Sequence, residues 1–559
     1  MARSNSVFMG FQLPNRAGGF QKSGGHKVPS STGIGRGDFR PDSTAIPGTQ
    51  PSLTQGVTAL VWRGLLWSLG VFMLTDGLAS SPAAKRPNVL MISVDDMNDW
   101  VGCLGSDRVP TPHIDALARR GFLFTNAHAP SPKCAPSRAA ILTGRRASTT
   151  GLYSNSHWWR PAYPNLVTLP QYFRNHDYYV AGGGKVHHHT PGFNPPDQWD
   201  TYAELVADQD LVVDYFKRRG EARRFFTEGM PRHPNNSLDW GPMDLGDMEM
   251  GDGNTVRWAK EFLTRNQQKP FFLAVGLFQP HLPFYAPEKY FEGLDQVPLP
   301  INKPGDLDDI PPGGQALAAL RRNDLRMIEE YDDLRRCMQS YLASIAHADA
   351  LVGILMDALD KSAHRDNTIV VFWSDHGYAF GEKDHFAKNT LWERSTHVPF
   401  ILSVPGITKP GSRTHRPVDL TCLYPTLTRL CGLPVPAGLD GVDVTPLLKN
   451  PDRPWKHPAI IDFLPGNTAI RTEHWRYIRY DQGRAGEELY YLPDDPEEWR
   501  NLIGQFPEKA AELKTWLPRL YATTVPSKGA YRFDRQTYTW TVMDEAASKV
   551  SRGDGGDGG

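Results

Sequence analysis

The chain has 559 residues, more than one hydrophobic core usually organises, so a large domain with a smaller partner is expected. Hydrophobic residues make up 40% of the sequence and aromatic residues 11%, which favours a globular enzyme and excludes a disordered or fibrous chain. The 61 basic and 62 acidic residues nearly balance, which argues against a nucleic-acid partner.

The N-terminal region precedes the part of the sequence that can form a core. Residues 1–56 are rich in Gly, Ser, Pro and Thr, and we expect them to be disordered or to result from a start site placed too far upstream. Residues 57–84 contain an apolar stretch behind Arg63 and then small residues, the pattern of a signal peptide. We therefore expect a secreted or periplasmic protein with no stable membrane partner after cleavage. The alternative is an uncleaved N-terminal anchor that leaves the protein facing outward.

Short apolar runs alternate with amphipathic segments over residues 86–444, which predicts a catalytic α/β domain with a large, mostly parallel sheet flanked by helices. Residues 445–545 predict a smaller C-terminal α+β domain, and residues 546–559 a flexible tail. The predicted strands of the large domain are 88–94, 178–181, 270–275, 368–373 and 398–404. Its predicted helices include 113–120, ended by Gly121, and 341–359. In the C-terminal domain, strands are expected at 469–480 and 488–492 and a helix at 507–520.

Polar clusters follow four of these predicted strands, at the point where each strand ends. In chain order the clusters are Asp95-Asp96, the segment from Lys185 to His189, the segment ending at His281, and Asp375-His376. Ligand crevices of open α/β sheets lie outside the carboxyl ends of the strands, so we expect these clusters to converge on one site.

Three of these side chains are carboxylates, those of Asp95, Asp96 and Asp375. At one crevice they would repel one another unless a divalent cation lay among them. Hard oxygen ligands favour Ca²⁺, or Mg²⁺, over zinc. His376 is then either a nitrogen ligand or a hydrogen-bond donor to Cys134. An Asp pair alone would more often cap a helix, but the second cluster after another strand favours a metal site.

The most specific motif of the chain is Cys134-Ala-Pro-Ser-Arg138, continued as Thr143-Gly-Arg145. Together with segments 93–96, 112–118, 184–186, 270–276, 280–284 and 374–377, it resembles the type I sulfatases of the alkaline phosphatase superfamily, and among them the iduronate-2-sulfatases. The resemblance extends over residues 87–500. It implies an alkaline phosphatase-like fold, a sulfuric ester hydrolase, and conversion of Cys134 to formylglycine by a formylglycine-generating or sulfatase-maturating enzyme.

The resemblance also implies two sets of site residues. The metal set, holding Ca²⁺ or Mg²⁺, is Asp95, Asp96, Cys134, Asp375 and His376. The catalytic set, around formylglycine and sulfate, is Cys134, Arg138, Lys185, His188, His281 and Lys388. The family places a histidine two or three residues after the lysine, so His187 is the alternative to His188. The run of three histidines also resembles a zinc-binding tract, but neighbours in an extended segment face opposite sides, so at most one or two can serve a site.

The implied function is removal of an O-sulfate from a sulfated carbohydrate, with a uronate 2-sulfate as the candidate substrate. One alternative is a phosphonate monoester hydrolase or phosphodiesterase that shares the modified cysteine. Another is a sulfated-glycan binding protein in which Cys134 stays a thiol. The role of two tryptophans remains open at this point, because Trp199 and Trp240 can either stack on sugars or pack in the core. The five cysteines are too scattered for a disulfide framework, which predicts free thiols.

Overall fold

The structure is a computed structural model that describes residues 86–543, apart from 223–224, 228 and 232–237. The N-terminal stretch predicted at 1–56, the signal-peptide pattern at 57–84 and the tail at 546–559 lie outside the described residues.

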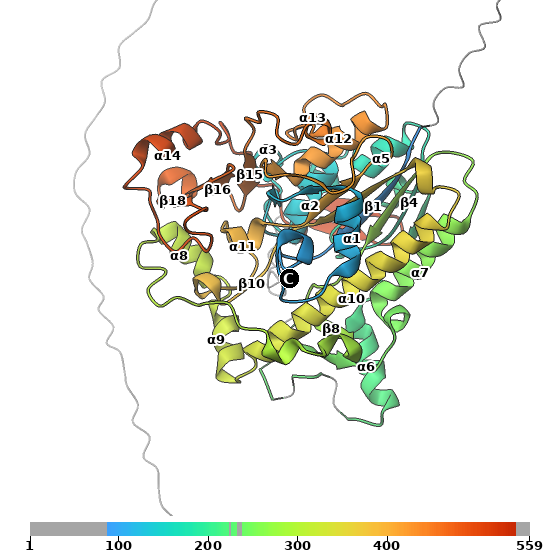
Figure 1. Cartoon of the computed structure of the whole chain (residues 1–559), viewed down its shortest axis with the longest axis horizontal. Helices are drawn as coiled ribbons and strands as arrows, with labels where there is room; N and C mark the ends of the chain where they lie inside the picture. Colours follow the sequence, from blue (N-terminus) through green and yellow to red (C-terminus); the bar gives the residue numbers. More distant parts are fainter. Residues whose placement is uncertain (1–85, 223–224, 228, 232–237, 544–559) are drawn as a thin grey trace, which may run out of the picture. The chain divides into compact units, whose positions relative to one another are not determined.

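An eight-stranded sheet organises most of the described chain, with strand order β13-β2-β12-β9-β1-β7-β4-β5 (Figure 1). The five strands from β9 to β5 run parallel, whereas β12 is antiparallel to both of its neighbours. The prediction of a large, mostly parallel sheet is confirmed. The strands are β1 (Asn88–Val94), β2 (Phe122–Phe124), β4 (Tyr179–Gly184), β5 (Thr201–Ala203), β7 (Phe271–Gly276), β9 (Thr368–Ser374), β12 (Phe400–Ser403) and β13 (Ser412–Thr414).

Both faces of this sheet are buried, so its strands are apolar at nearly every position. In β1, Val89 and Met91 pack against α2, α5, α12 and α13 on one face, while Leu90 and Ile92 pack against α1, α7 and α10 on the other. Figure 1 shows these two helix layers on opposite sides of the sheet. The helices are α1 (Pro112–Arg120), α2 (Cys134–Thr143), α5 (Leu169–Arg174), α7 (Gly251–Thr264), α10 (Leu334–Asp360), α12 (Leu423–Leu430) and α13 (Thr445–Lys449).

The longest helix, α10, contains the predicted helix 341–359 and extends it at both ends. It has 27 residues and is long and apolar enough to cross a membrane by those criteria alone. However, 78% of its most apolar stretch is buried inside the fold, against α1, α7 and the strands β6 (Trp240–Met243) and β8 (Phe284–Pro287). It is therefore a core helix of the catalytic region.

The two tryptophans left open by the sequence are core residues. Trp240 is fully buried, and its indole N–H donates to Asp333 Oδ2 over 2.9 Å. Trp199 is also buried, and its ring packs against Tyr202 at 5.0 Å between centroids. Neither side chain offers a surface on which a sugar could stack.

A second sheet follows, antiparallel and four-stranded, in the order β15-β16-β17-β18. One face packs on α14 through Tyr477 and Leu513, and the other contacts Trp392 of the large domain. The predicted strand 469–480 is a hairpin, because the Thr472 N–H turns back to the carbonyl of Trp475 at 2.9 Å. The predicted helix 507–520 ends early, ahead of Pro518, as expected before a proline. The elements are β15 (Ala459–Asp462), β16 (Thr468–Arg471), β17 (Trp475–Arg479), β18 (Glu487–Tyr491) and α14 (Pro507–Lys514).

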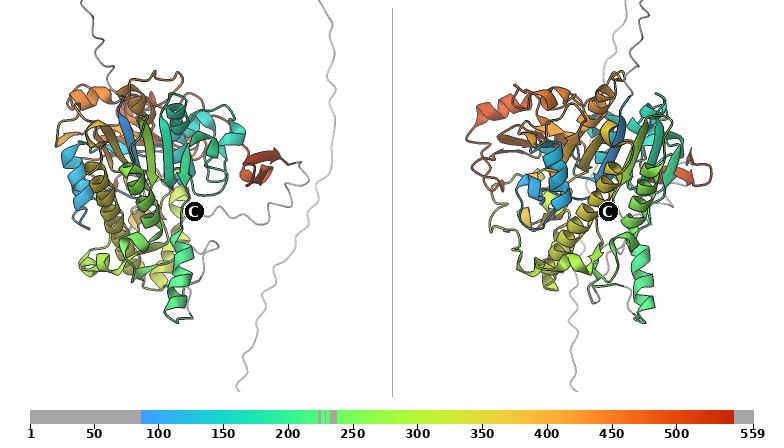
Figure 2. Two further views of the ribbon diagram at one scale, coloured as in Figure 1. Left: turned by 90° about the vertical axis from the view of Figure 1, so that its right-hand side faces the viewer. Right: turned by 45° about the vertical axis from the view of Figure 1, so that its right-hand side comes forward.

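One further hairpin, β19 (Tyr531–Asp534) and β20 (Thr539–Val542), lies near the end of the described chain. Figure 2 shows it, in dark red, apart from the other red and orange elements of the C-terminal region. The rings of Phe533 and Trp540 contact Trp158 at 5.4 and 6.3 Å between centroids. The hairpin therefore packs on the large domain, far from the four-stranded sheet that precedes it in sequence.

Candidate active site

The carboxyl ends of β9, β1, β7 and β4 are neighbours in the sheet, and the polar clusters that follow these strands meet there. The Lys185 ammonium, after β4, donates to Asp95 Oδ2, after β1. The Asp96 N–H donates to Asp375 Oδ1, after β9, over 3.1 Å. Asp96 has a φ of 65°, a left-handed conformation that is strained for a residue with a side chain and that often marks functional sites. The convergence predicted from strand order alone is thus found.

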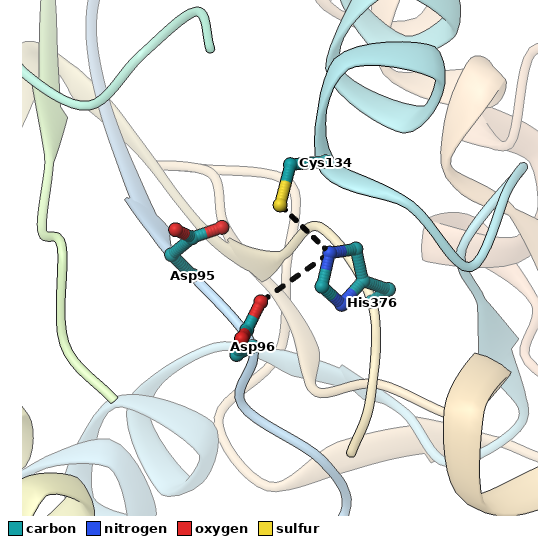
Figure 3. A group of neighbouring side chains, drawn as sticks. All are labelled: Asp95, Asp96, Cys134 and His376. Carbon is teal, nitrogen blue, oxygen red and sulfur yellow. Dashed lines mark hydrogen bonds and ion pairs between the residues drawn. The ribbon is translucent and has the colours of Figure 1, made fainter. Parts of the chain in front are cut away.

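Cys134 is the first residue of α2 and is completely buried. Its Sγ lies 3.2 Å from His376 Nε2 and 3.1 Å from Lys388 Nζ. Figure 3 shows the side chains of Cys134, Asp95, Asp96 and His376 pointing toward one another. Burial raises the pKa of the Cys134 thiol. No disulfide joins any of the five cysteines, all of which lie among the described residues, as expected from their scattered positions.

A metal ion fits among these four residues. One ligand atom from each of Asp95, Asp96, Cys134 and His376 lies within 4.8 Å of all the others. Two buried carboxylates and an imidazole nitrogen can serve as ligands for a divalent cation. Asp375, which the sequence also placed in the metal set, lies at the edge of this group: its Oδ2 is 3.6 Å from His376 Nε2 and accepts a hydrogen bond from Arg138 Nε at 2.9 Å.

Buried cations surround the carboxylates. Arg138, only 1% exposed, donates to Asp95 Oδ1 at 3.1 Å as well as to Asp375. Lys388 Nζ donates to Asp96 Oδ1 at 2.7 Å. Burial opposes a charge on Asp95, but Lys185 and Arg138 outweigh it and hold its pKa well below the usual range. Burial raises the pKa of Asp96 to about 7 even beside Lys388, so this carboxylate would gain most from a further positive charge.

Lys388 reaches the site from the short hairpin of β10 (Ala379–Phe380) and β11 (Phe386–Ala387). The residues on either side of it, Ala387 and Asn389, have φ values of 73° and 83°. His385 Nε2 lies 2.6 Å from the carbonyl oxygen of Lys388. Strained backbone on both sides of a buried lysine indicates that the surrounding structure fixes its position.

The loop that carries His281 rests on a buried polar network that the sequence did not reveal. The Asp252 carboxylate, from α7, accepts the N–H groups of Phe278 at 2.8 Å and Gln279 at 2.9 Å. The Gln279 amide donates to Asp208 at 3.2 Å, and its Oε1 lies 2.5 Å from His347 Nδ1. Burial raises the pKa of Asp252 to about 7 and that of Asp208 to about 6. The loop is therefore positioned by side chains of three helices, which contribute Asp208, Asp252 and His347.

His281 itself is buried and neutral. Burial lowers its pKa well below the usual range, and the charges of Lys185 and Lys388 lower it further. Its Nδ1 lies 2.5 Å from the carbonyl of Leu282, so Nδ1 carries the proton and donates it. Nε2 is then the nitrogen that is free to accept a proton.

The three consecutive histidines have different surroundings. His187 Nε2 lies 3.2 Å from Gln198 Oε1 and its ring stacks on Trp159, so it is a core residue. His188 is buried next to the site, and burial, His189 and Lys185 together hold its pKa well below the usual range. His189 is exposed, and its ring lies 6.1 Å from that of His281 between centroids.

Comparison with known proteins agrees with this geometry. The family model described as Sulfatase matches residues 87–433, and the model described as N-sulphoglucosamine sulphohydrolase, C-terminal, matches residues 381–522. The chain belongs to the sulfatase family. A sulfatase of Formosa agariphila is 35% identical over 465 residues, which are 78% of this chain and 87% of that protein. The iduronate 2-sulfatase of Homo sapiens is 32% identical over 428 residues, 67% of this chain and 74% of that protein.

Solved structures confirm the alkaline phosphatase-like fold. The structure of BT4656 in complex with D-glucosamine-2-N,6-O-disulfate has a TM-score of 0.60 and 21% identity, covering 77% of this sulfatase and 96% of that chain. The phosphonate monoester hydrolase of Agrobacterium radiobacter has a TM-score of 0.61 and 21% identity, covering 82% and 100%. This chain is a sulfuric ester hydrolase. A metal and a formylglycine are typical of the family in general, and the buried Asp-Asp-Cys-His cluster is compatible with both.

Proposed function

We propose that this sulfatase removes an O-sulfate from a sulfated carbohydrate, with a uronate 2-sulfate as its substrate. The observation that carries the proposal is Cys134 at the start of α2, completely buried and facing two carboxylates, His376 and Lys388. The 32% identity to an iduronate 2-sulfatase over 67% of the chain supports the choice of substrate. We further propose that position 134 carries formylglycine, that Ca²⁺ is the metal, and that Asp95, Asp96, Asp375 and His376 hold it.

In this arrangement the cation would offset the negative charge of the carboxylates and of the sulfate ester. A formylglycine hydrate at position 134 would supply the hydroxyl that attacks sulfur. Lys185 and Lys388, both buried, are placed to donate hydrogen bonds to sulfate oxygens as charge moves between them in the transition state. Arg138 binds Asp95 and Asp375 at once and so orients two of the proposed ligands. Each cation is paired with a carboxylate in the free enzyme, which keeps it in position before substrate arrives.

The departing sugar oxygen needs a proton, and His281 is the candidate donor. Its Nδ1–H is fixed by the carbonyl of Leu282, which leaves Nε2 for the reaction. Nε2 has no proton in the free enzyme, because burial and two lysines keep the ring neutral. An anionic sulfate ester near those lysines favours the charged ring, so we expect proton uptake to accompany substrate binding.

Export of the chain and modification of Cys134 complete the proposal. The signal-peptide pattern at 57–84 supports export to the periplasm or the medium, with an uncleaved outward-facing anchor as the alternative. Formation of formylglycine from Cys134 requires a formylglycine-generating or sulfatase-maturating enzyme as a transient partner.

The test begins with mass spectrometry of the peptide that contains position 134, taken from protein made in a host with a maturating enzyme. The same protein is then assayed on an aryl sulfate, an aryl phosphonate, a phosphodiester and a panel of defined sulfated saccharides, with Cys134→Ala as the control. We expect formylglycine at position 134, turnover of the aryl sulfate, and a preference for a 2-sulfated uronate. Faster turnover of the phosphonate or the phosphodiester would support the alternative hydrolase. Full activity with an intact cysteine would refute the role of formylglycine.

A further inference from the structure

A pocket of about 210 Å³ lies beside the candidate active site. Two segments far apart in sequence form it: the loop and strand that follow β4, and the hairpin β19–β20. Its principal lining residues are His188, His189, Tyr202, Glu204, Arg535 and Tyr538. The hairpin lies beyond the ranges matched by either family model, which end at residues 433 and 522. This wall of the pocket is therefore not explained by membership of the family.

The hairpin is fixed against the large domain. Its residues Tyr531, Phe533 and Trp540 surround Trp158 at 5.4 to 6.4 Å between ring centroids. The Tyr538 hydroxyl accepts the N–H of Asn194 over 3.0 Å. The pocket thus has two firm walls and does not depend on a loose chain end.

The pocket adjoins the candidate active site. His189 lines it, and the His189 ring is also the neighbour of His281, 6.1 Å away between centroids. Gly184, another lining residue, directly precedes Lys185. His188, which belongs to the predicted catalytic set, lines the pocket too. We therefore expect a chain of sugars whose sulfate lies at Cys134 to extend past His189 toward this pocket.

The chemistry of the pocket suits one anionic sugar. The Arg535 side chain is exposed and forms no ion pair or hydrogen bond with any described residue, Glu204 included. A free guanidinium matches the paired oxygens of a carboxylate or a sulfate. The Tyr538 ring beside it offers a face and a hydroxyl, as sugar sites commonly do. The volume is below the ~300 Å³ of sites for drug-sized ligands, which limits the occupant to about one monosaccharide.

We propose that this pocket binds the sugar residue next to the sulfate-bearing one, and that Arg535 recognises a carboxylate or sulfate on that neighbour. The proposal rests on the proposed function and makes the chain selective for a sulfated polysaccharide with anionic groups on adjacent residues. It concerns binding only, because Arg535 is not part of the set around Cys134.

The test compares Arg535→Ala with Arg532→Ala, an exposed arginine of the same hairpin that does not line the pocket. Both variants and the parent, all carrying formylglycine, are assayed on an aryl sulfate and on the sulfated monosaccharide identified by the saccharide screen. They are also assayed on disaccharides of that sugar with a neutral, a carboxylated or a sulfated neighbour. We expect Arg535→Ala to raise KM about tenfold for one or both anionic disaccharides, at unchanged kcat, which corresponds to about 1.4 kcal/mol. All other combinations are expected to stay within about twofold of the parent.

Three results would overturn the proposal. One is an equal loss on the aryl sulfate, because this would mean that Arg535 supports the whole site. Another is an equal rise in KM for the anionic disaccharides in Arg532→Ala, because this would mean that the positive charge of the hairpin matters and not the position of Arg535. The third is an unchanged KM for both anionic disaccharides. A parent enzyme that cleaves no sulfate ester would instead refute the proposed function, so the two failures are distinguishable. The carboxylated and sulfated arms show which anion Arg535 prefers.

Discussion

Replacement of Arg476 by alanine is expected to loosen the contact between the four-stranded sheet and the catalytic region. Arg476 lies on β17, is completely buried, and forms ion pairs with Glu393 and with Glu498, the latter at 2.7 Å. It also donates to the carbonyl of Leu391 at 2.6 Å and to Thr396 Oγ1 at 3.1 Å. Three of these partners, Leu391, Glu393 and Thr396, follow closely after Lys388 in sequence. One guanidinium therefore joins the C-terminal sheet to the segment that carries a candidate catalytic lysine.

The expected loss in free energy of unfolding depends on which partners Glu393 and Glu498 keep in the variant. Removing one member of a buried ion pair typically costs about 3–5 kcal/mol, because the other member stays buried and unpaired. Glu393 keeps Arg471, at 3.1 Å, and Glu498 keeps the Glu393 N–H, at 2.7 Å, which places the cost near the low end, at about 3 kcal/mol. With about 2.1 cal/mol/K per residue over roughly 450 folded residues, this corresponds to a fall in Tm of about 3 °C.

The assay is thermal and urea unfolding of Arg476→Ala at pH 5 and pH 8, with Arg484→Ala as the control. Arg484 is exposed and pairs with Asp481 three residues away, so its removal is expected to cost less than about 0.5 kcal/mol. Burial already raises the pKa of Glu498 to about 7, and loss of Arg476 raises it further. At pH 5 Glu498 is protonated in the variant, so no unpaired charge is buried there. The loss in free energy of unfolding relative to the parent should therefore be larger at pH 8. A deficit equal to that of Arg484→Ala, or one that does not grow with pH, would refute this reasoning.

Three further outcomes are expected. Chelation of the metal from the purified enzyme should abolish turnover and lower the free energy of unfolding by about 3 kcal/mol. This is the stabilisation expected from a metal present at about 100 times its Kd, and added Ca²⁺ should restore both activity and stability. An unchanged Tm would contradict a metal at Asp95 and Asp96. His281→Ala should slow desulfation of alkyl and sugar esters by about 10²–10⁴ and of activated aryl esters much less; equal losses would count against proton donation. For Asp252, the folded-state pKa of about 7 lies above the unfolded value, so its contribution to stability is lost as pH rises toward 7. The stability of the parent relative to Asp252→Asn should therefore fall between pH 4 and 7, and a constant difference in urea unfolding would disprove the assigned shift.

The sheet and the gathering of carboxylates at its edge could be predicted because both depend on local patterns. The strand 88–94 is apolar at almost every position, as a strand buried on both faces must be, and β1 has the same bounds. Asp95, Asp96 and Asp375 could be brought together in advance because parallel neighbours end at the same edge of a sheet. The roles of individual side chains around Cys134 came from the motif and remain predictions.

What could not be predicted depends on contacts between distant segments. Nothing in residues 531–542 indicates that they pack on Trp158, because neither segment has a periodic pattern that identifies the other. The support of the His281 loop by Asp252 is of the same kind, since a buried acid on a helix looks in sequence like a solvated one. Which of the three adjacent histidines are buried and which is exposed is decided by the loop backbone.

The complete burial of Cys134 fixes an order of events in the life of the chain. The thiol sits at the first turn of α2, which packs against α12, a segment that is made nearly three hundred residues later. A modifying enzyme has to bind the peptide around position 134, whereas a substrate only has to insert a sulfate group. Because Ala135, Pro136, Ser137 and Arg138 are buried as well, we expect conversion of Cys134 to precede folding of this segment. Conversion and folding then compete in time, and a substitution that speeds folding of this segment would yield protein that is equally stable but less active.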